Sequence, residues 1–508
     1  MSKRGRRNFG LLSLLVVVGA SGLAACSSDS TDGNHAGNAG ESGEAGASAG
    51  GAHAGTAGIP GAGSGAHAGS AGTPGQAGSS SAGESAGGDS AGGDSAGGAA
   101  GLGGEAGASA PPWTVDARLS ALSPLPALPP DPTNKYAENS GAAVLGQMLF
   151  FDKRYSGPLT VASDLGAIND TGKVACATCH SGPAMTDARA PFNVTVGTGT
   201  HSRNAPALVN SSFYEWTNWA GRFAAQWELP LAVAENVLTM NSSRLKLAHF
   251  IYDNYKVPYE TVFGALPAAL AANAADAARF PAAGKPGDGA AWDSTSAMTA
   301  EDKAAVNLII VNFGKAIQAY MRKLVSRNAP FDQYVANGGG NLSESAVRGA
   351  LLFVGKAKCN SCHSGPSFSD NQFHNLGGLG ADEGRFKDAA ALKASALNID
   401  GVFSDKTDTG RLANLTNPMT DATTRSAFRT ASLREVKDTA PYMHNGQLPD
   451  LAAVVSFYNA GGGEAVAGST KDPLLTPLSL SDTEQADLVE FLKTLSGEPV
   501  PSTLLAPP

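Results

Sequence analysis

Two Cys-x-x-Cys-His runs constrain the fold of this 508-residue chain more than any other feature. They are Cys176-Ala-Thr-Cys179-His180 and Cys359-Asn-Ser-Cys362-His363. In such a run, two thiols add to the vinyl groups of a haem, and the adjacent imidazole binds its iron. The sequence therefore predicts two covalently bound haem c groups, with His180 and His363 as the proximal iron ligands.

A structural zinc site and a redox dithiol are the alternatives for a single run of this kind. The chain has five cysteines, four of which lie in the two runs. No other cluster of cysteine and histidine could complete a tetrahedral zinc site. The fifth cysteine, Cys26, lies in the N-terminal signal, so no cysteine is left for a disulfide.

Residues 1–25 have the pattern of an export signal: basic residues, the apolar run Phe9–Val18, then Leu-Ala-Ala before Cys26. The apolar run is too short to span a bilayer as a mature helix. The Leu-Ala-Ala-Cys ending resembles a bacterial lipobox, which implies lipidation of Cys26; an ordinary signal with a stray cysteine is the alternative. Because Ser27 replaces a retention Asp, we expect a cell-envelope protein held at the outer membrane by its lipid alone, facing the periplasm or the cell surface.

The charge of the mature chain argues against a role on nucleic acids. Residues 1–25 carry four of the 36 Lys and Arg, which leaves 32 basic and 45 acidic side chains and a net charge of −13. No basic patch is present that could neutralise phosphates. The acidic balance favours a basic or neutral protein partner.

Composition predicts a flexible tether followed by two folded domains. Residues 26–110 are mostly Gly, Ala and Ser, with too little apolar bulk to offset chain entropy. The remaining residues suffice for two haem domains, which we expect at 111–335 and 336–508. Strand signals are sparse, so the fold class is mostly α, with two cytochrome c-like domains in tandem.

Helical patterns recur in both halves of the folded part. Leu145-Gly-Gln-Met-Leu-Phe-Phe and Arg348-Gly-Ala-Leu-Leu-Phe-Val have apolar residues at helical spacing just upstream of the two cysteine runs. Apolar periodicity predicts a helix over Ala304–Val325. Ser481-Asp-Thr-Glu484 is a capping box that opens a further helix.

Several segments together resemble the bacterial dihaem cytochrome c peroxidases and their MauG-like relatives. They include Leu145-Gly-Gln-Met-Leu-Phe-Phe-Asp, Arg203-Asn-Ala-Pro, Trp219-Ala-Gly-Arg222, Phe428-Arg-Thr-Ala-Ser-Leu-Arg and Ala440-Pro-Tyr-Met-His-Asn-Gly446. The resemblance implies that the first haem, with proximal His180, reacts with peroxide, while the second is low-spin and passes electrons. It also implies that Trp219 bridges the two haems. Plain core packing is the alternative role for Trp219.

The sixth ligand of the second haem separates the two branches of this family. By the resemblance, it lies fourteen residues after the histidine of the Pro-Tyr-x-His-x-Gly motif: a Met in the peroxidases and a Tyr in the MauG-like proteins. Counting from His444 leads to Tyr458, which favours the MauG-like branch. A phenolate stabilises ferric and higher-valent iron. Met443 is an alternative ligand, and an ordinary buried tyrosine is the alternative role for Tyr458.

The resemblance further implies a calcium ion between the domains. Its positions match Asn204, Thr439 and Pro441 here, and oxygen ligands of this kind suit calcium. Three such ligands are too few without waters, and a simple turn asparagine is the alternative role for Asn204.

The family's distal groups are absent from the expected positions. Peroxide cleavage needs an acid/base that moves a proton between the two oxygens. Aligned from Trp219, the family's distal Glu falls on Thr239 and its Gln on Leu229. Glu235, one helical turn before Thr239, and His201 are the candidates that remain; a solvated helix-face acid is the alternative for Glu235.

We therefore expect a dihaem oxidoreductase that reduces hydrogen peroxide at the first haem. Electrons would come from a small cytochrome or cupredoxin, or from aromatic residues of a protein substrate. The alternative is a non-catalytic dihaem electron-transfer lipoprotein. The sequence does not identify the donor, nor does it say whether two chains associate as a homodimer.

Overall fold

The computed structural model describes residues 115–187, 189, 193–293, 295–406 and 421–508. These residues belong to one compact unit, Ser109–Pro508. The predicted signal, Cys26 and nearly all of the predicted tether lie outside that unit and outside the described residues. Within them, no helix is both long and apolar enough to cross a bilayer.

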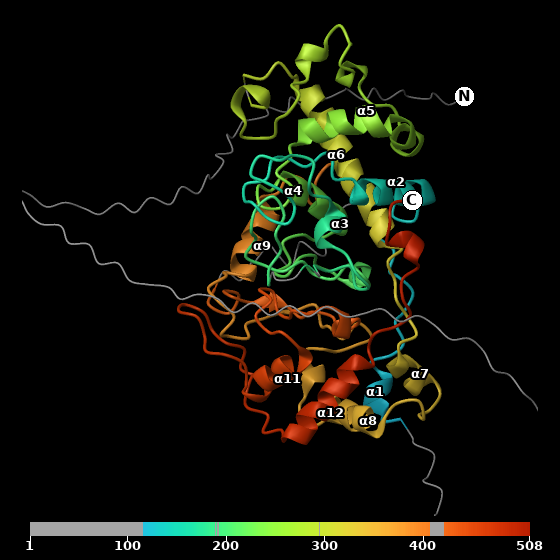
Figure 1. Cartoon of the computed structure of the whole chain (residues 1–508), viewed down its shortest axis with the longest axis vertical. Helices are drawn as coiled ribbons and strands as arrows, with labels where there is room; N and C mark the ends of the chain where they lie inside the picture. The colour runs from blue at the N-terminus through green and yellow to red at the C-terminus, as the bar shows by residue number, and fades with distance from the viewer. Residues whose placement is uncertain (1–114, 188, 190–192, 294, 407–420) are drawn as a thin grey trace, which may run out of the picture. The chain divides into compact units, whose positions relative to one another are not determined.

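The described part of the chain is mostly helical, as predicted (Figure 1). The α-helices are α1 (Ala117–Ser120), α2 (Ser140–Phe151), α3 (Cys176–Cys179), α4 (Leu229–Glu235), α5 (Arg244–Phe263), α6 (Ala300–Met321), α7 (Pro330–Ala336), α8 (Glu344–Val354), α9 (Arg385–Ala394), α11 (Leu451–Asn459) and α12 (Asp482–Lys493). The short 3-10 helices are η1 (Ser211–Phe213), η2 (Gln226–Glu228), η3 (Ala268–Leu270), η4 (Ala277–Arg279), η5 (Gly289–Ala291), η6 (Cys359–Ser361), η7 (Val436–Asp438) and η8 (Ser502–Leu504). Two short strands, β1 (Phe373–His374) and β2 (Phe428–Arg429), pair antiparallel, with Phe373 opposite Arg429.

The first hydrophobic core forms where α2 packs against α6. The side chain of Thr299 accepts from the N–H of Asp302, and the Asp302 carboxylate accepts from Thr299, so α6 begins with a capping box. Gly146 of α2 lets the helices approach closely, because a Cβ at this position would lie 1.9 Å from the carbonyl oxygen of Ala316. The predicted helix over 304–325 is thereby confirmed, beginning and ending four residues earlier.

The second core repeats this arrangement with α8 and α12. Ser481 caps α12 through the predicted capping box with Glu484. Gly349 of α8 takes the place of Gly146, since a Cβ there would lie 2.0 Å from the carbonyl oxygen of Asp487. In both cores, the helix just upstream of a cysteine run therefore packs on a later helix through a glycine.

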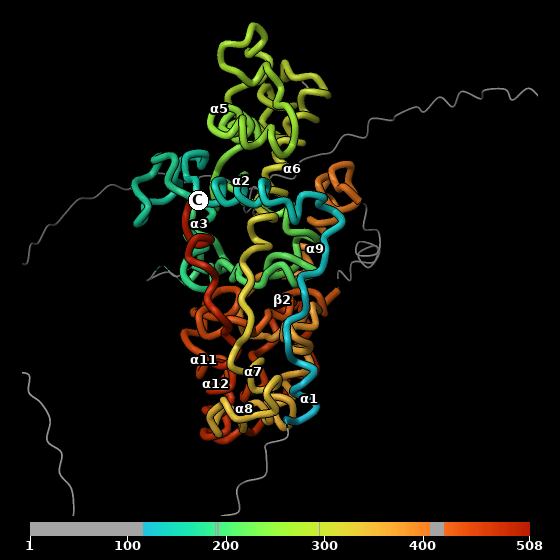
Figure 2. Tube along the Cα trace, turned by 90° about the vertical axis from the view of Figure 1, so that its right-hand side faces the viewer, coloured from blue at the N-terminus to red at the C-terminus, as the bar shows by residue number. Residues whose placement is uncertain are grey.

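Both ends of the described chain cross between the two cores. Leu119 of α1 belongs to the core of α8 and α12, and the Arg118 guanidinium donates to the carbonyl of Val354. At the other end, Gln147 of α2 donates to the carbonyls of Thr503 and Ala506. Figure 2 follows both crossings along the trace.

Candidate functional site

The first cysteine run folds into one helical turn, α3. The N–H of His180 donates to the carbonyl of Cys176 at 3.0 Å, and its Nδ1 lies 3.1 Å from the carbonyl oxygen of Met185. A carbonyl oxygen only accepts, so Nδ1 carries the ring proton and Nε2 keeps the lone pair that an iron would bind. Burial lowers the pKa of His180, which favours the neutral, iron-binding imidazole.

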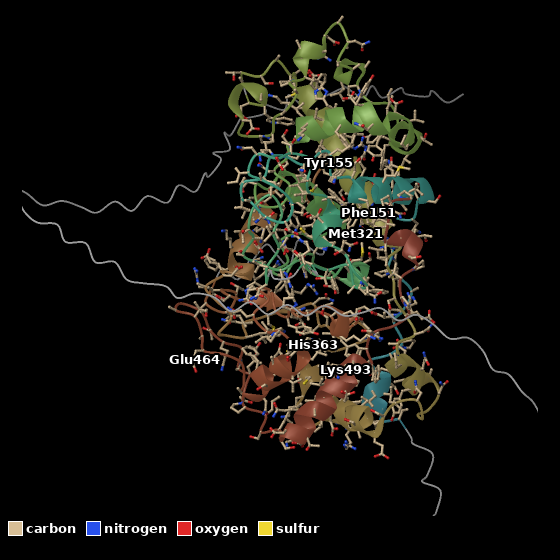
Figure 3. The ribbon with its side chains drawn as sticks, viewed as in Figure 1. Phe151, Tyr155, Met321, His363, Glu464 and Lys493 are labelled. Carbon is tan, nitrogen blue, oxygen red and sulfur yellow. The ribbon has the colours of Figure 1, made fainter. Side chains whose placement is uncertain are left out.

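The second run repeats this geometry at η6. The N–H of His363 donates to the carbonyl of Cys359 at 2.9 Å, and its Nδ1 lies 3.0 Å from the carbonyl oxygen of Phe368. Burial lowers the pKa of His363 as well. His363 lies in the half that contains α8 and α12 (Figure 3). Both imidazoles are thus held in the same tautomer by a carbonyl five residues downstream.

The repeat extends beyond the pentapeptides, which the sequence reasoning missed. Both runs continue as His-Ser-Gly-Pro, and the residues that supply the carbonyls have left-handed backbones, with φ of 54° at Met185 and 51° at Phe368. The next hydroxyl donates across to a distant segment at 2.7 Å in both cases, from Thr186 to Ala205 and from Ser369 to Thr430. We call these two segments, Cys176–Thr186 and Cys359–Ser369, the first and the second cradle. The shared His-Ser-Gly-Pro is the sequence signal that could have revealed them.

The side chains around both runs fit a haem c. All four cysteines are free thiols, so none is consumed by a disulfide. At the first run, the ring of Phe150 lies 6.4 Å from the His180 ring, centroid to centroid, and the hydroxyl of Tyr155 lies 3.8 Å from the Sγ of Cys176. A haem bound there would supply reversible one-electron chemistry and an iron that can bind peroxide.

Replacing both Cys359 and Cys362 with serine is expected to lower the covalently bound haem from about two to about one per chain, because each run attaches its own haem. The pyridine haemochrome spectrum and the intact mass of the protein measure this content. Cys26→Ser is the control and should leave the haem content unchanged. Full haem content in the double variant would contradict the assignment.

Trp219 lies between the two cradles. Its indole N–H donates to the carbonyl of Asn204 at 2.7 Å, in the segment that packs on the first cradle. Its own carbonyl accepts from the N–H of Arg429 at 2.8 Å, in β2, next to Thr430 of the second cradle. Asn204 in turn donates through its N–H to the carbonyl of His444 at 2.6 Å. The structure thus brings Trp219 into contact with both halves, and its role as a bridge between two haems stays a prediction.

A cavity of about 490 Å³ opens beside α4. Residues of α4, of 201–203 and of 381–388 line it. Arg203 is clamped there by two carboxylates, with Nε 2.6 Å from Asp382 and Nη1 2.8 Å from Asp388. His201 is half-buried in the wall, and its Nδ1 accepts from the N–H of Arg203 at 3.3 Å. Burial, followed by the charge of Arg203, lowers the pKa of His201.

Comparisons with known proteins agree with this geometry. Residues 140–339 match the family model of the di-haem cytochrome c peroxidases. The cytochrome-c peroxidase IdrP1 of Denitromonas iodatirespirans is 32% identical over 394 residues, covering 75% of this chain and 88% of that protein. The chain belongs to the dihaem cytochrome c peroxidase family.

Other relatives of this chain include the methylamine utilization protein MauG of Methylorubrum extorquens, 28% identical over 71% of this chain and 79% of MauG. The fold is similar to that of a MauG-like protein associated with microbial copper homeostasis, at 22% identity and a TM-score of 0.50, covering 76% of this chain and 98% of that structure. Membership implies two c-type haems and makes the chain an oxidoreductase of the dihaem peroxidase type.

The two positions where the family's distal Gln and Glu were expected do line the cavity, but Glu235 does not. Leu229 and Thr239 are both in its wall. Glu235 is not among the described residues that line it. Its carboxylate forms a bidentate ion pair with Arg244, at 2.8 and 3.0 Å, and accepts from the Arg244 N–H as well. A catalytic role for Glu235 stays a prediction that requires this ion pair to open.

Tyr458 of α11 lies near the second cysteine run. Burial raises its pKa well above the usual range, and the nearby thiols of Cys359 and Cys362 add to the rise. Met443 has a left-handed backbone, with φ of 70°, in the turn that ends at Gly446. The structure thus places Tyr458 near the second cysteine run, and ligation by Tyr458 or by Met443 stays a prediction.

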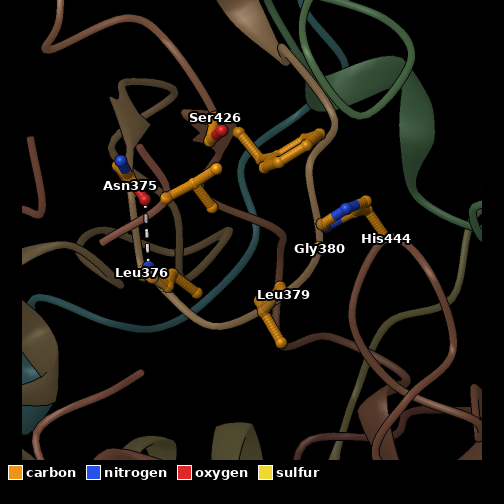
Figure 4. Close-up of a pocket in the computed structure, with 9 residues that line it drawn as sticks. Asn375, Leu376, Leu379, Gly380, Ser426 and His444 are labelled. Carbon is orange, nitrogen blue, oxygen red and sulfur yellow. Dashed lines mark hydrogen bonds between the residues drawn. The ribbon is translucent and has the colours of Figure 1, made fainter. Parts of the chain in front are cut away.

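The other three histidines among the described residues, His249, His374 and His444, also have partners. Both ring nitrogens of His374 contact carboxylates, Asp472 at 2.6 Å and Asp370 at 3.0 Å. Both ring nitrogens of His249 lie 3.1 Å from backbone carbonyls. His444 stacks on Phe428 at 3.7 Å, and burial lowers its pKa to about 4. Figure 4 shows it beside a cavity of about 10 Å³, where only a water molecule would fit.

Two of the three predicted calcium ligands meet in the structure. The side-chain amide of Asn204 lies 3.1 Å from the carbonyl oxygen of Pro441, although 237 residues separate them in sequence. The hydroxyl of Thr439 donates to the carbonyl of Val436, and ligation by the Thr439 backbone carbonyl, which is the predicted ligand atom, stays a prediction. In the Asn204–Pro441 contact, the Asn204 amide nitrogen donates to Pro441, while its Oδ1 accepts from the N–H of Ala205 at 2.9 Å. Only the Pro441 carbonyl thus presents an oxygen here, and calcium binding stays a prediction.

Proposed function

We propose that this chain reduces hydrogen peroxide at the haem of the first cysteine run and draws electrons through the haem of the second. The observation that carries the proposal is Trp219, which is hydrogen-bonded to the segment at each cradle. The indole of Trp219 bonds to one of these segments and its backbone carbonyl to the other, so an oxidisable residue is fixed to both sides. This placement suits the sharing of oxidising equivalents between two sites. A protein that only stored haem would not need such a link.

His201 is the acid/base that we assign to the cavity. A neutral imidazole presents a lone pair that takes the first peroxide proton and returns it to the departing oxygen. At 3.3 Å, the contact from Arg203 to Nδ1 is long enough for a peroxide O–H to replace it. The lowered pKa of His201 keeps this ring neutral at pH 7.

His201→Gln is expected to slow the reaction with peroxide by about 10²-fold, the usual contribution of a positioned acid/base. In the parent protein, the rate should be constant around neutral pH and fall on the acid side, below the usual range of a histidine pKa, because only the imidazolium lacks the lone pair. Stopped-flow absorbance of the diferric protein mixed with equimolar peroxide measures both effects.

Glu235→Gln serves as the matched comparison. Because Glu235 is paired with Arg244, this variant should react with peroxide at nearly the parent rate. A slow Glu235→Gln together with an unchanged His201→Gln would transfer the acid/base role to Glu235. No reaction in any of the proteins, even after one-electron reduction, would contradict peroxide reduction altogether.

The source of the electrons is a protein in our proposal. Tyr458, as the sixth ligand of the second haem, would favour the higher-valent iron that withdraws electrons from aromatic side chains of a protein substrate. A small cytochrome or cupredoxin is the other donor class, and the net charge of −13 suits a basic one. Lipidation of Cys26 would keep either reaction at the cell envelope.

One observation favours the second candidate function, a non-catalytic electron-transfer lipoprotein. Leu229 and Thr239 line the cavity at the positions where family members carry Gln and Glu, so the α4 side offers no carboxylate. Electron paramagnetic resonance distinguishes the two functions. Two low-spin haems in every redox state would support the carrier, whereas a high-spin ferric haem supports the peroxidase.

A further inference from the structure

A row of aromatic rings leads from the first cysteine run to helix α5. The hydroxyl of Tyr155 lies 3.8 Å from the Sγ of Cys176. The ring of Tyr155 is 5.4 Å from that of Phe250, and the ring of Phe250 is 5.7 Å from that of Tyr255, centroid to centroid. Tyr155, labelled in Figure 3, is fully buried, whereas Tyr255 is half-buried. The row thus runs from Cys176, where a haem thioether would form, towards the surface.

The hydroxyls at the two ends of this row have different partners. Tyr155 donates to the carbonyl of Leu149 at 3.0 Å. Tyr255 donates to the carboxylate of Asp152 at 2.7 Å. A tyrosine that loses an electron becomes strongly acidic and must give up its phenolic proton. A carboxylate can take that proton, but an amide carbonyl is too weak a base to keep it.

The hydroxyls of two other tyrosines in this core bond to amide groups, as the hydroxyl of Tyr155 does. Tyr320 donates to the carbonyl of Leu504, and Tyr259 accepts from the side chain of Asn312. Among the tyrosines of the first core whose hydroxyl bonds the structure describes, only Tyr255 has a carboxylate as acceptor. The proton acceptor therefore distinguishes Tyr255 from its neighbours.

Tyr255 is held in this position by a break in α5. Its backbone is non-helical, with φ of −132° and ψ of 17°. Pro258, three residues later, cannot donate a backbone hydrogen bond to Asn254 and so interrupts the helix there. Arg154 holds the Asp152 carboxylate at 2.6 Å, and its guanidinium lies over the Phe250 ring at 5.2 Å. Although burial opposes it, hydrogen bonding from Arg154 lowers the pKa of Asp152, so this group is ionised at neutral pH.

We propose that Tyr255 is a redox-active tyrosine that delivers an electron to the first haem site through Phe250 and Tyr155. The inference rests on the proposed peroxide reaction, since peroxide is the oxidant. One electron leaves the Tyr255 ring, and its phenolic proton moves along the 2.7 Å hydrogen bond to Asp152. The product is a neutral tyrosyl radical beside a protonated carboxylic acid. This route is independent of Trp219 and of the second haem.

The test uses the full holoprotein with both haems, mixed with equimolar hydrogen peroxide and freeze-quenched for electron paramagnetic resonance. Ring-deuterated tyrosine identifies a tyrosyl signal by its narrowed hyperfine structure. We expect this signal in the parent protein and its loss in Tyr255→Phe, while peroxide consumption continues. Asp152→Asn, which removes the base, should also lose it.

Tyr252→Phe is the matched control, because Tyr252 lies on the same helix and is also half-buried but contacts Lys256 rather than the ring row. This variant should keep the signal. Spin trapping followed by tandem mass spectrometry should place the adduct on Tyr255. Peroxide consumption with an unchanged signal in Tyr255→Phe would overturn this inference alone. No peroxide consumption in the parent protein would overturn the inference and the proposed function together.

Discussion

Trp219→Phe is expected to lower turnover with an external electron donor by at least about tenfold, which corresponds to about 1.4 kcal/mol of barrier. A phenyl ring is harder to oxidise than an indole, and it lacks the N–H that donates to Asn204 at 2.7 Å. The first reaction of the diferric protein with peroxide should change little, because Trp219 is not among the described residues that line the cavity beside α4. Steady-state turnover and single-turnover stopped-flow absorbance separate the two effects.

Trp216→Phe is the matched control for this experiment. Trp216 lies three residues away and is buried, but its ring packs against Phe373 and under the Arg385 guanidinium rather than hydrogen bonding to Asn204. Its replacement should therefore leave turnover largely unchanged. Full turnover in Trp219→Phe would contradict the bridging role and leave core packing as the function of this side chain.

Asp332→Ala is expected to lower the free energy of unfolding by about 3–5 kcal/mol, the usual cost of leaving a buried charge without its partner. The Asp332 carboxylate lies 2.7 and 2.9 Å from the guanidinium of Arg434, whose side chain is 2% exposed. Arg434 also donates to the carbonyls of Leu122 and Pro366. The pair thus joins α7, the segment after α1 and the His-Ser-Gly-Pro turn of the second cradle. Urea denaturation of the holoprotein, followed by circular dichroism, measures the loss.

A double replacement sharpens this prediction. Asp332→Leu combined with Arg434→Met removes both charges, so it should be less destabilising than Asp332→Ala alone. Asp116→Ala breaks the exposed pair with Arg118 and should have little effect. A single variant as stable as the parent protein would show that water reaches Arg434 and replaces the carboxylate.

The haem attachment could be predicted from sequence because it depends on residues within five positions of one another. The turn that presents Cys176, Cys179 and His180 is closed by its own backbone, so the motif carries its geometry with it. The cap of α12 could be predicted for the same reason, since a capping box spans four residues. The repeated His-Ser-Gly-Pro is equally local.

The distal side of the cavity could not be predicted in this way. Glu235 lies one helical turn before Thr239, and nothing in that spacing shows that Arg244 turns its carboxylate into an ion pair. The position of His201 in the cavity wall depends on Arg203, which is in turn clamped by Asp382 and Asp388, about 180 residues later. Such side chains take their direction from partners that only the folded chain brings near.

The sequence by itself determined the two haem runs, the helices beside them and the family, because short-range periodicity and covalent chemistry depend on neighbouring residues. Only the tertiary structure decided that Trp219 touches both cradles, that Asn204 meets Pro441 and that Tyr255 faces Asp152. These contacts join segments about 15 to 237 residues apart. These contacts form because the packing of the two cores holds distant segments next to one another. Packing of this kind leaves no pattern in the local sequence.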